Sequence, residues 1–123
     1  MGVKRVEDLI AFQLARAFKL EVYRIVDASP RASADFKYKS QLLEAAAGVE
    51  GTISEGFYRY RAAEFAQFLS YALASLGEAQ TRLEDGIHRR HFADSECAEA
   101  FVLAKRCRVA TIRLRQSLRR FVP

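Results

Sequence analysis

Two histidines and an aspartate lie close together in a pattern that could bind a metal ion. His88 and His91 are three residues apart, and Asp94 follows three residues later. A zinc site would need a further ligand, which we expect only if a second subunit contributes it. The paired Glu-x-x-His motifs of di-iron bundles, Gly-rich phosphate loops and nucleophile elbows are all missing from the sequence. The sequence therefore predicts a non-catalytic protein without metal, cofactor or small-molecule substrate.

Basic residues at the C-terminal end are the second chemical feature. No acidic residue follows Glu99, whereas seven basic ones do. Arg106, Arg113 and Arg120 recur every seven residues, so on a helix they form one line, here called the arginine row. Lys105, Arg108, Arg115 and Arg119 form a second basic strip. Such lines can contact the phosphates of RNA or DNA without sequence preference. The alternative is a solvated or interface surface, on which arginine stems cover apolar groups.

Four amphipathic helices are expected to position these residues. The hydrophobic spacing predicts helices over about residues 6–27, 36–60 and 62–87, and a fourth that starts at a cap, Asp94 or Ser95, and runs to the C-terminus. Residues 29–35 are expected to form a loop, because Pro30 ends the first helix. Four long helices with short connections favour an all-α, antiparallel up-down four-helix bundle, a single domain over residues 1–123.

Several apolar residues fall outside the predicted core faces. In the fourth helix Ala100, Leu103, Cys107, Ala110, Leu114 and Phe121 follow a 3-4 spacing interrupted at Ser117, while Val102, Val109 and Ile112 lie on another face. Phe12 and Tyr23 fall outside the stripe of the first helix. Gly48, Gly51 and Gly56 lie inside the second, which indicates either close packing or a frayed or kinked helix. The leftover apolar surface predicts self-association.

Composition excludes several classes of protein. With 123 residues, half of them hydrophobic, and a net charge of +5, the chain has the make-up of a folded basic domain. No apolar run approaches the roughly 20 residues of a membrane span, and the N-terminal residues have neither the apolar core of a signal peptide nor a myristoylation motif. We expect a cytoplasmic protein with no membrane partner. Cys97 and Cys107 are expected to be reduced and buried.

The segment Thr52-Ile53-Ser54-Glu55-Gly56-Phe57-Tyr58-Arg59 resembles a known signature. It is similar to the Asn-Ile-Ala-Glu-Gly-x-x-Arg motif of small bacterial four-helix-bundle proteins encoded in intervening sequences of 23S rRNA genes. Asp8-Leu9 and Glu64-Phe65 also match the family pattern, whereas Leu43-Glu44 stands where the family has Arg-Arg. That departure removes two positive charges.

The resemblance implies a four-helix bundle and no established chemistry. Members are similar in fold to the accessory variability determinant of diversity-generating retroelements, a basic pentamer that works with a reverse transcriptase and nucleic acid. It therefore implies a cyclic homo-oligomer, most simply a pentamer, and a structural role for Thr52, Ile53, Glu55, Gly56 and Arg59. Glu55 and Arg59, four residues apart, are expected to form a structural ion pair; the alternative is a polar patch for a partner or ligand.

These observations predict an oligomeric scaffold or adaptor. It would bind nucleic acid, or a protein that handles nucleic acid, through its basic C-terminal helix. The alternative is a protein–protein interaction module with no nucleic-acid role, which the loss of the Arg-Arg pair at Leu43-Glu44 favours.

Overall fold

Helices account for all regular secondary structure in residues 2–122, the part of the chain that the computed structural model describes. A short 3-10 helix, η1 (Val6–Asp8), precedes the five α-helices α1 (Ile10–Ala28), α2 (Pro30–Ala34), α3 (Phe36–Phe57), α4 (Ala62–His88) and α5 (Asp94–Arg119). No strand occurs within this range, which confirms the all-α prediction. None of these described helices is long and apolar enough to cross a membrane.

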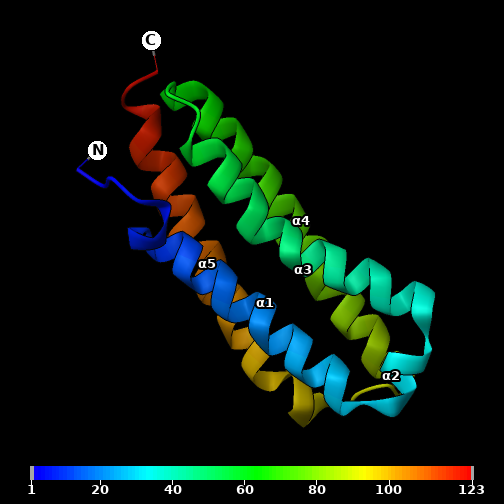
Figure 1. Cartoon of the computed structure of the whole chain (residues 1–123). Coiled ribbons are helices and arrows are strands. Elements are labelled where there is room, and N and C mark those ends of the chain that lie inside the picture. Colours follow the sequence, from blue (N-terminus) through cyan, green and yellow to red (C-terminus); the bar gives the residue numbers. More distant parts are fainter. Residues whose placement is uncertain (1, 123) are drawn as a thin grey trace.

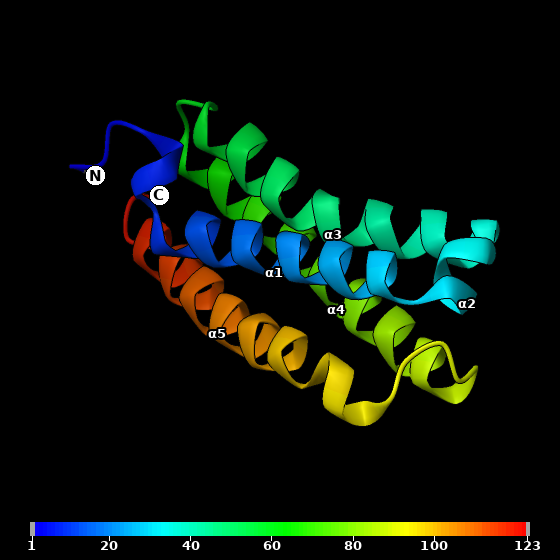
Figure 2. The same cartoon turned by 60° about the horizontal axis from the view of Figure 1, so that its bottom comes forward.

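The four long helices pack as a bundle around one hydrophobic core. α3 lies against α4 and α1, and α5 lies against α1 and α4, so each long helix has two neighbours (Figures 1 and 2). The largest fully buried side chains of the core come from α1, α3 and α4. They are Phe18, Leu42, Ile53, Leu69, Leu76 and Leu83. α5 contributes mostly small residues to the core, which include Cys97, Ala100, Ala104 and Cys107.

The predicted loop over residues 29–35 is wrong, because it contains the helix α2. The Ser29 hydroxyl accepts a hydrogen bond from the Ala32 N–H at 3.1 Å, and Pro30 follows at the first helical position. A serine cap followed by proline is a strong start signal for a helix as well as a stop signal for the preceding one. Asp35 then caps α3 by accepting from the Tyr38 N–H at 3.4 Å.

The start of α5 also differs from the prediction, since neither Asp94 nor Ser95 is the cap. The cap residue is Ala93, and its N–H donates to the Glu96 carboxylate at 2.8 Å. Glu96 thus satisfies the backbone N–H of the cap residue, as in one half of a capping box; the other half is missing because alanine has no side-chain acceptor.

α4 ends in a hydrogen-bonded turn that leads into the loop before α5. Arg90 has a φ of 63°, in the left-handed region, and is the only non-glycine residue of the described chain with a positive φ. The N–H groups of Arg90 and His91 donate to the carbonyls of Ile87 and Gly86, both at about 2.9 Å or less. This pair of hydrogen bonds is a Schellman motif, which normally places glycine at the left-handed position.

The buried face of α5 coincides only in part with the predicted seam. Ala100, Leu103 and Cys107 of that seam are buried, and Ala110 and Leu114 pack against the core. The rest of the buried face comes from a second 3-4 series, which shares Ala100, Cys107 and Leu114 with the predicted one. Its other members are Cys97, Ala104, Thr111 and Leu118, all buried. Phe121, predicted in the seam, lies beyond the helix and is exposed. The hydroxyl of Thr111 is accommodated beside the Cys107 thiol at 3.8 Å, which hydrophobicity alone does not predict.

Phe12 falls outside the apolar stripe predicted for the first helix, but it lies in the core with 3% of its surface exposed. Because α1 packs between α3 and α5, its buried arc is wider than one stripe. Close packing, predicted for the glycines of α3, is found at two of the three, and the helix is continuous through all of them. Gly56 is packed against side chains of α4, and Gly48 has a neighbour at 3.3 Å, whereas Gly51 faces open space.

Candidate functional site

The arginine row lies on the outer side of α5. Arg106 and Arg113 of α5, and Arg120 at its C-cap, are all exposed, on the side of the helix opposite the buried stripe. Val102 and Val109 share this face and are also exposed. None of the three arginines forms an ion pair with another residue of the described chain. The row therefore presents three solvated guanidinium groups over about 21 Å, at 1.5 Å rise per residue.

The second basic strip is divided by contacts with α4. Lys105 and Arg119 are exposed, but Arg108 and Arg115 are half-buried. Arg108 donates to the Gln80 side chain, and Arg115 donates to the Ser70 hydroxyl at 3.1 Å. Arg108 and Arg115 thus connect α5 to α4. Their charges are less available to an external ligand than the spacing of the basic residues in the sequence predicts.

The signature segment has an inner and an outer half. Ile53 is fully buried, and Gly56 is buried against α4. On the outside, Arg59 contacts Glu55 at 3.2 Å and Glu64 at 3.8 Å, and its guanidinium lies 4.9 Å from the centre of the Phe68 ring. Arg59 therefore joins the end of α3 to the start of α4. Thr52, at the Asn position of the motif, is partly buried.

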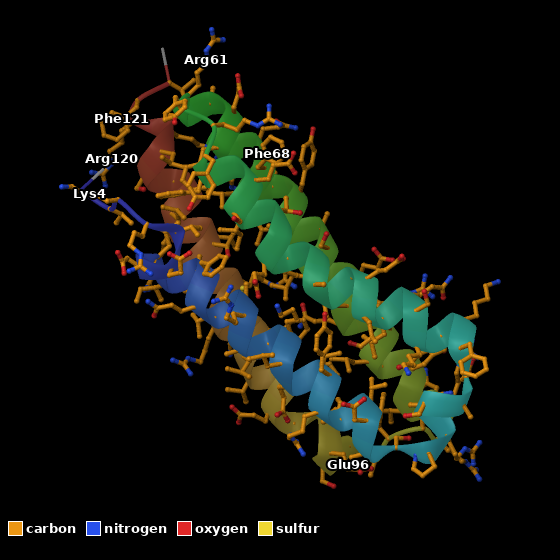
Figure 3. The ribbon with its side chains drawn as sticks, viewed as in Figure 1. Lys4, Arg61, Phe68, Glu96, Arg120 and Phe121 are labelled. Atoms are coloured by element: carbon orange, nitrogen blue, oxygen red, sulfur yellow. The ribbon has the colours of Figure 1, made fainter. Side chains whose placement is uncertain are left out.

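A cavity of about 540 Å³ opens at the end of the bundle where α3 turns into α4. We call it the end pocket. Its lining comes from three distant segments: Val3 and Lys4, the turn from Phe57 to Ala62 with Phe65, and Leu118 with Phe121. Lys4, Arg120 and Phe121 lie together at this end, whereas Glu96 marks the opposite end (Figure 3). Within the described residues the lining is aromatic, aliphatic and basic, with no carboxylate.

A family model, that of the 23S rRNA-intervening sequence proteins, matches residues 7–112. The chain belongs to this family. The match begins in η1 and ends within α5, so it contains Arg106 but not Arg113 or Arg120. No curated protein matches the chain. In this member of the 23S rRNA-intervening sequence protein family, two thirds of the arginine row thus lie outside the part that defines the family.

The histidines considered as metal ligands are separated in the structure. His91 is nearly buried and its Nε2 lies 2.9 Å from the Asp35 carboxylate, while His88 is exposed. The hydrogen bond with His91, with the charge of Arg89 nearby, lowers the pKa of Asp35. Nowhere in residues 2–122 do three His, Cys, Asp or Glu side chains come together as a metal site would require. In this family member His91 serves to connect the α4–α5 loop to the cap of α3.

Both cysteines are free and buried, as predicted. Burial raises the pKa of Cys97 to about 11 and that of Cys107 to about 11. A thiol with such a pKa is protonated at neutral pH, whereas the thiolate is the reactive form.

The end pocket is not evident from the sequence. Its residues are far apart in the chain, and their meeting depends on how the helix ends are arranged. One local signal was present: Tyr58-Arg59-Tyr60-Arg61 alternates aromatic and basic residues directly after the signature. Alternation of this kind is typical of surfaces that combine stacking with phosphate contacts.

Proposed function

We propose that the protein is a non-catalytic, oligomeric scaffold that binds nucleic acid through the outer face of α5. One observation carries this proposal: the arginine row is solvated, unpaired within the described chain and interrupted by no acidic residue. Guanidinium groups in a line can neutralise successive phosphates, and the release of counterions drives such binding. Lys105 and Arg119 flank the row and add to its charge.

The proposal includes assembly of copies of this chain. We propose an antiparallel up-down bundle that forms a cyclic oligomer, most simply a pentamer, in the cytoplasm. Large apolar side chains remain exposed on one chain, among them Ile10 and Leu20 of α1, Phe36 of α3 and Val102 of α5. A ring would repeat the arginine row in each subunit, so that weak phosphate contacts combine into useful affinity. Light scattering should then give a multiple of 13.9 kDa.

A charge-matched comparison tests the role of the arginine row. The first variant replaces Arg106, Arg113 and Arg120 with Gln. The control replaces Arg31, Lys37 and Arg90 with Gln; these basic residues are exposed and belong to α2, α3 and the α4–α5 loop. Both variants lose three positive charges, so a difference between them reports position rather than net charge.

Binding of single-stranded RNA is measured over a range of salt concentrations. Loss of three phosphate contacts should reduce the slope of log K against log salt by about 2, since each contact contributes about 0.7. The control variant should keep the wild-type slope. Equal binding by both variants and wild type, or no binding by wild type at low salt, would reject the nucleic-acid function.

A protein–protein interaction module remains the second candidate. Val102 and Val109 lie within the face of the arginine row and are exposed, an arrangement suited to an apolar contact with a charged rim. Leu43, at the first position of the family's Arg-Arg pair, is partly buried and Glu44 is exposed. If this candidate is correct, Val102→Ser with Val109→Ser should abolish partner binding or reduce the oligomer mass, while the triple Arg→Gln variant should not.

A further inference from the structure

We propose that the end pocket receives a base of single-stranded nucleic acid, and that Lys4 and Arg61 on its rim attract the phosphates of the strand. This inference deepens the proposed function, on which it rests, because it assigns a second contact site and restricts the ligand to unpaired strands. The inner wall of the end pocket belongs to the core, since Phe65 and Leu118 are buried and Val3, Phe57 and Ala62 pack against the core. Its rim, formed by Lys4, Tyr58, Tyr60, Arg61 and Phe121, is exposed.

Three aromatic side chains of the end pocket are largely exposed to solvent. Tyr60 is 101% exposed, Phe121 67% and Tyr58 57%. They surround a cavity of about 540 Å³, within the range of about 300–1,000 Å³ typical of small-molecule pockets. Phe57 and Phe65 form its inner wall, with their ring centres 6.0 Å apart in an edge-to-face arrangement. Tyr58 is paired with Phe57, their ring centres 5.1 Å apart, whereas Tyr60 and Phe121 form no aromatic pair in the described chain. A planar group can therefore enter from solvent and stack on Tyr60 or Phe121.

Charge determines which planar group fits. Three cations line the end pocket, and within the described residues no carboxylate does. Arg59 is already neutralised by Glu55 and Glu64, but Lys4 and Arg61 form no ion pair in the described chain. Uncompensated cations beside exposed rings complement a ligand that is both flat and anionic. A nucleotide unit has this chemistry, and stacking platforms in basic grooves are how proteins bind single strands.

The location connects the end pocket to the arginine row. Arg120 is the last arginine of the row and directly precedes Phe121, which lines the end pocket. Figure 3 shows Arg120, Phe121 and Lys4 at the same end of the bundle. A strand whose phosphates follow α5 toward its C-terminus would thus arrive at the end pocket, where an unstacked base can leave the strand and bind.

Removal of bases from the ligand tests this proposal directly. Two single-stranded DNA oligonucleotides are compared, one with ordinary bases and one of equal length with abasic sites, which keeps the phosphates. Stacking of one base changes affinity by about 5- to 100-fold. Wild-type protein should bind the ordinary oligonucleotide tighter by a factor in that range.

The variant Tyr60→Ala with Phe121→Ala should lose this preference and bind both oligonucleotides equally. Both residues lie outside the helices and are largely exposed, so the fold should be unaffected. Phe36→Ala is the matched control, because Phe36 is 78% exposed but belongs to the far end of α3. The control should keep the wild-type preference. A double variant that retains the preference would overturn the proposal.

The remaining outcomes separate this proposal from the proposed function. The triple Arg→Gln variant of the row should bind both oligonucleotides more weakly but keep the preference for bases. Wild-type protein that binds the two oligonucleotides equally would overturn the end-pocket proposal alone. Wild-type protein that binds neither would overturn both. A double variant with a smaller oligomer mass than wild type would also overturn the end-pocket proposal, because a second copy of the chain would then cover the aromatic groups.

Discussion

Gly56 and Gly51 lie in the same helix, five residues apart, and an alanine should stabilise the protein at Gly51 but not at Gly56. A Cβ atom added at Gly56 would lie 2.5 Å from the Phe68 Cβ and 3.0 Å from the Phe65 Cδ1. Carbon atoms in contact are ordinarily about 3.5–4.0 Å apart. At Gly51 no atom lies within 4 Å of the added Cβ. Neither glycine has a positive φ, so alanine is compatible with the backbone at both.

The magnitudes follow from two effects. Replacement of glycine by alanine inside a helix stabilises by about 1 kcal/mol, and this applies to both variants. Overpacking in a well-filled site costs about 1–3 kcal/mol, and this applies to Gly56→Ala alone. Gly51→Ala should therefore be more stable than wild type by up to about 1 kcal/mol. Gly56→Ala should be less stable than Gly51→Ala by about 1–3 kcal/mol, since the helix effect cancels between them.

Urea denaturation followed by circular dichroism measures both differences. The three proteins are compared at one protein concentration, because association shifts apparent stability. Equal m-values would show that the midpoints report stability. If Gly56→Ala were as stable as Gly51→Ala, the close approach of α3 to α4 at the signature would be disproved. The structural role assigned to Gly56 would fail with it.

Three further substitutions test other contacts. Arg90→Gly should stabilise by about 0.5–1 kcal/mol in urea denaturation, because glycine adopts the left-handed conformation without strain; a loss of stability would contradict this. Asp35→Asn should be less stable than wild type at neutral pH. Because the native pKa of Asp35 is lowered, its contribution is present above the unfolded value of about 4 and disappears as pH falls through the native value, so the two stability curves should converge in acid. Parallel curves would reject the interaction with His91. Glu50→Gln should destabilise by about 1–3 kcal/mol, because Glu50 is largely buried and pairs with two cations of α1, one of them the Lys19 ammonium at 2.8 Å; an unchanged urea midpoint would show that the pair is not formed.

The helices could be predicted because their cause is local. The 3-4 spacing of apolar residues in α4, from Phe65 to Leu83, defines its buried face in sequence and in structure alike. Helix ends depend on single hydrogen bonds, which explains the errors at Ser29 and at Ala93. In α5 two overlapping apolar series were available, and the choice between them depends on the small residues Ala104 and Thr111, which packing rather than hydrophobicity selects.

The two candidate sites also differ in how far the sequence predicts them. The arginine row is a property of one helix, so its spacing revealed it. Whether a basic residue of α5 is free depends on the neighbouring helix, and no feature near Arg115 in the sequence indicates its hydrogen bond to Ser70. The end pocket requires Lys4, Tyr60 and Phe121 to meet, which only the arrangement of three chain segments determines.

The meeting of both chain ends at the end pocket has a practical consequence for labelling. Figure 1 shows the N and C ends together at the end of the bundle where α3 turns into α4. An affinity tag or fluorophore attached at either end would be tethered beside Tyr60 and Phe121 and would compete with any ligand there. Ala34, exposed in α2 at the far end, is a better attachment point. A thiol introduced by Ala34→Cys would react selectively, because Cys97 and Cys107 are buried and protonated.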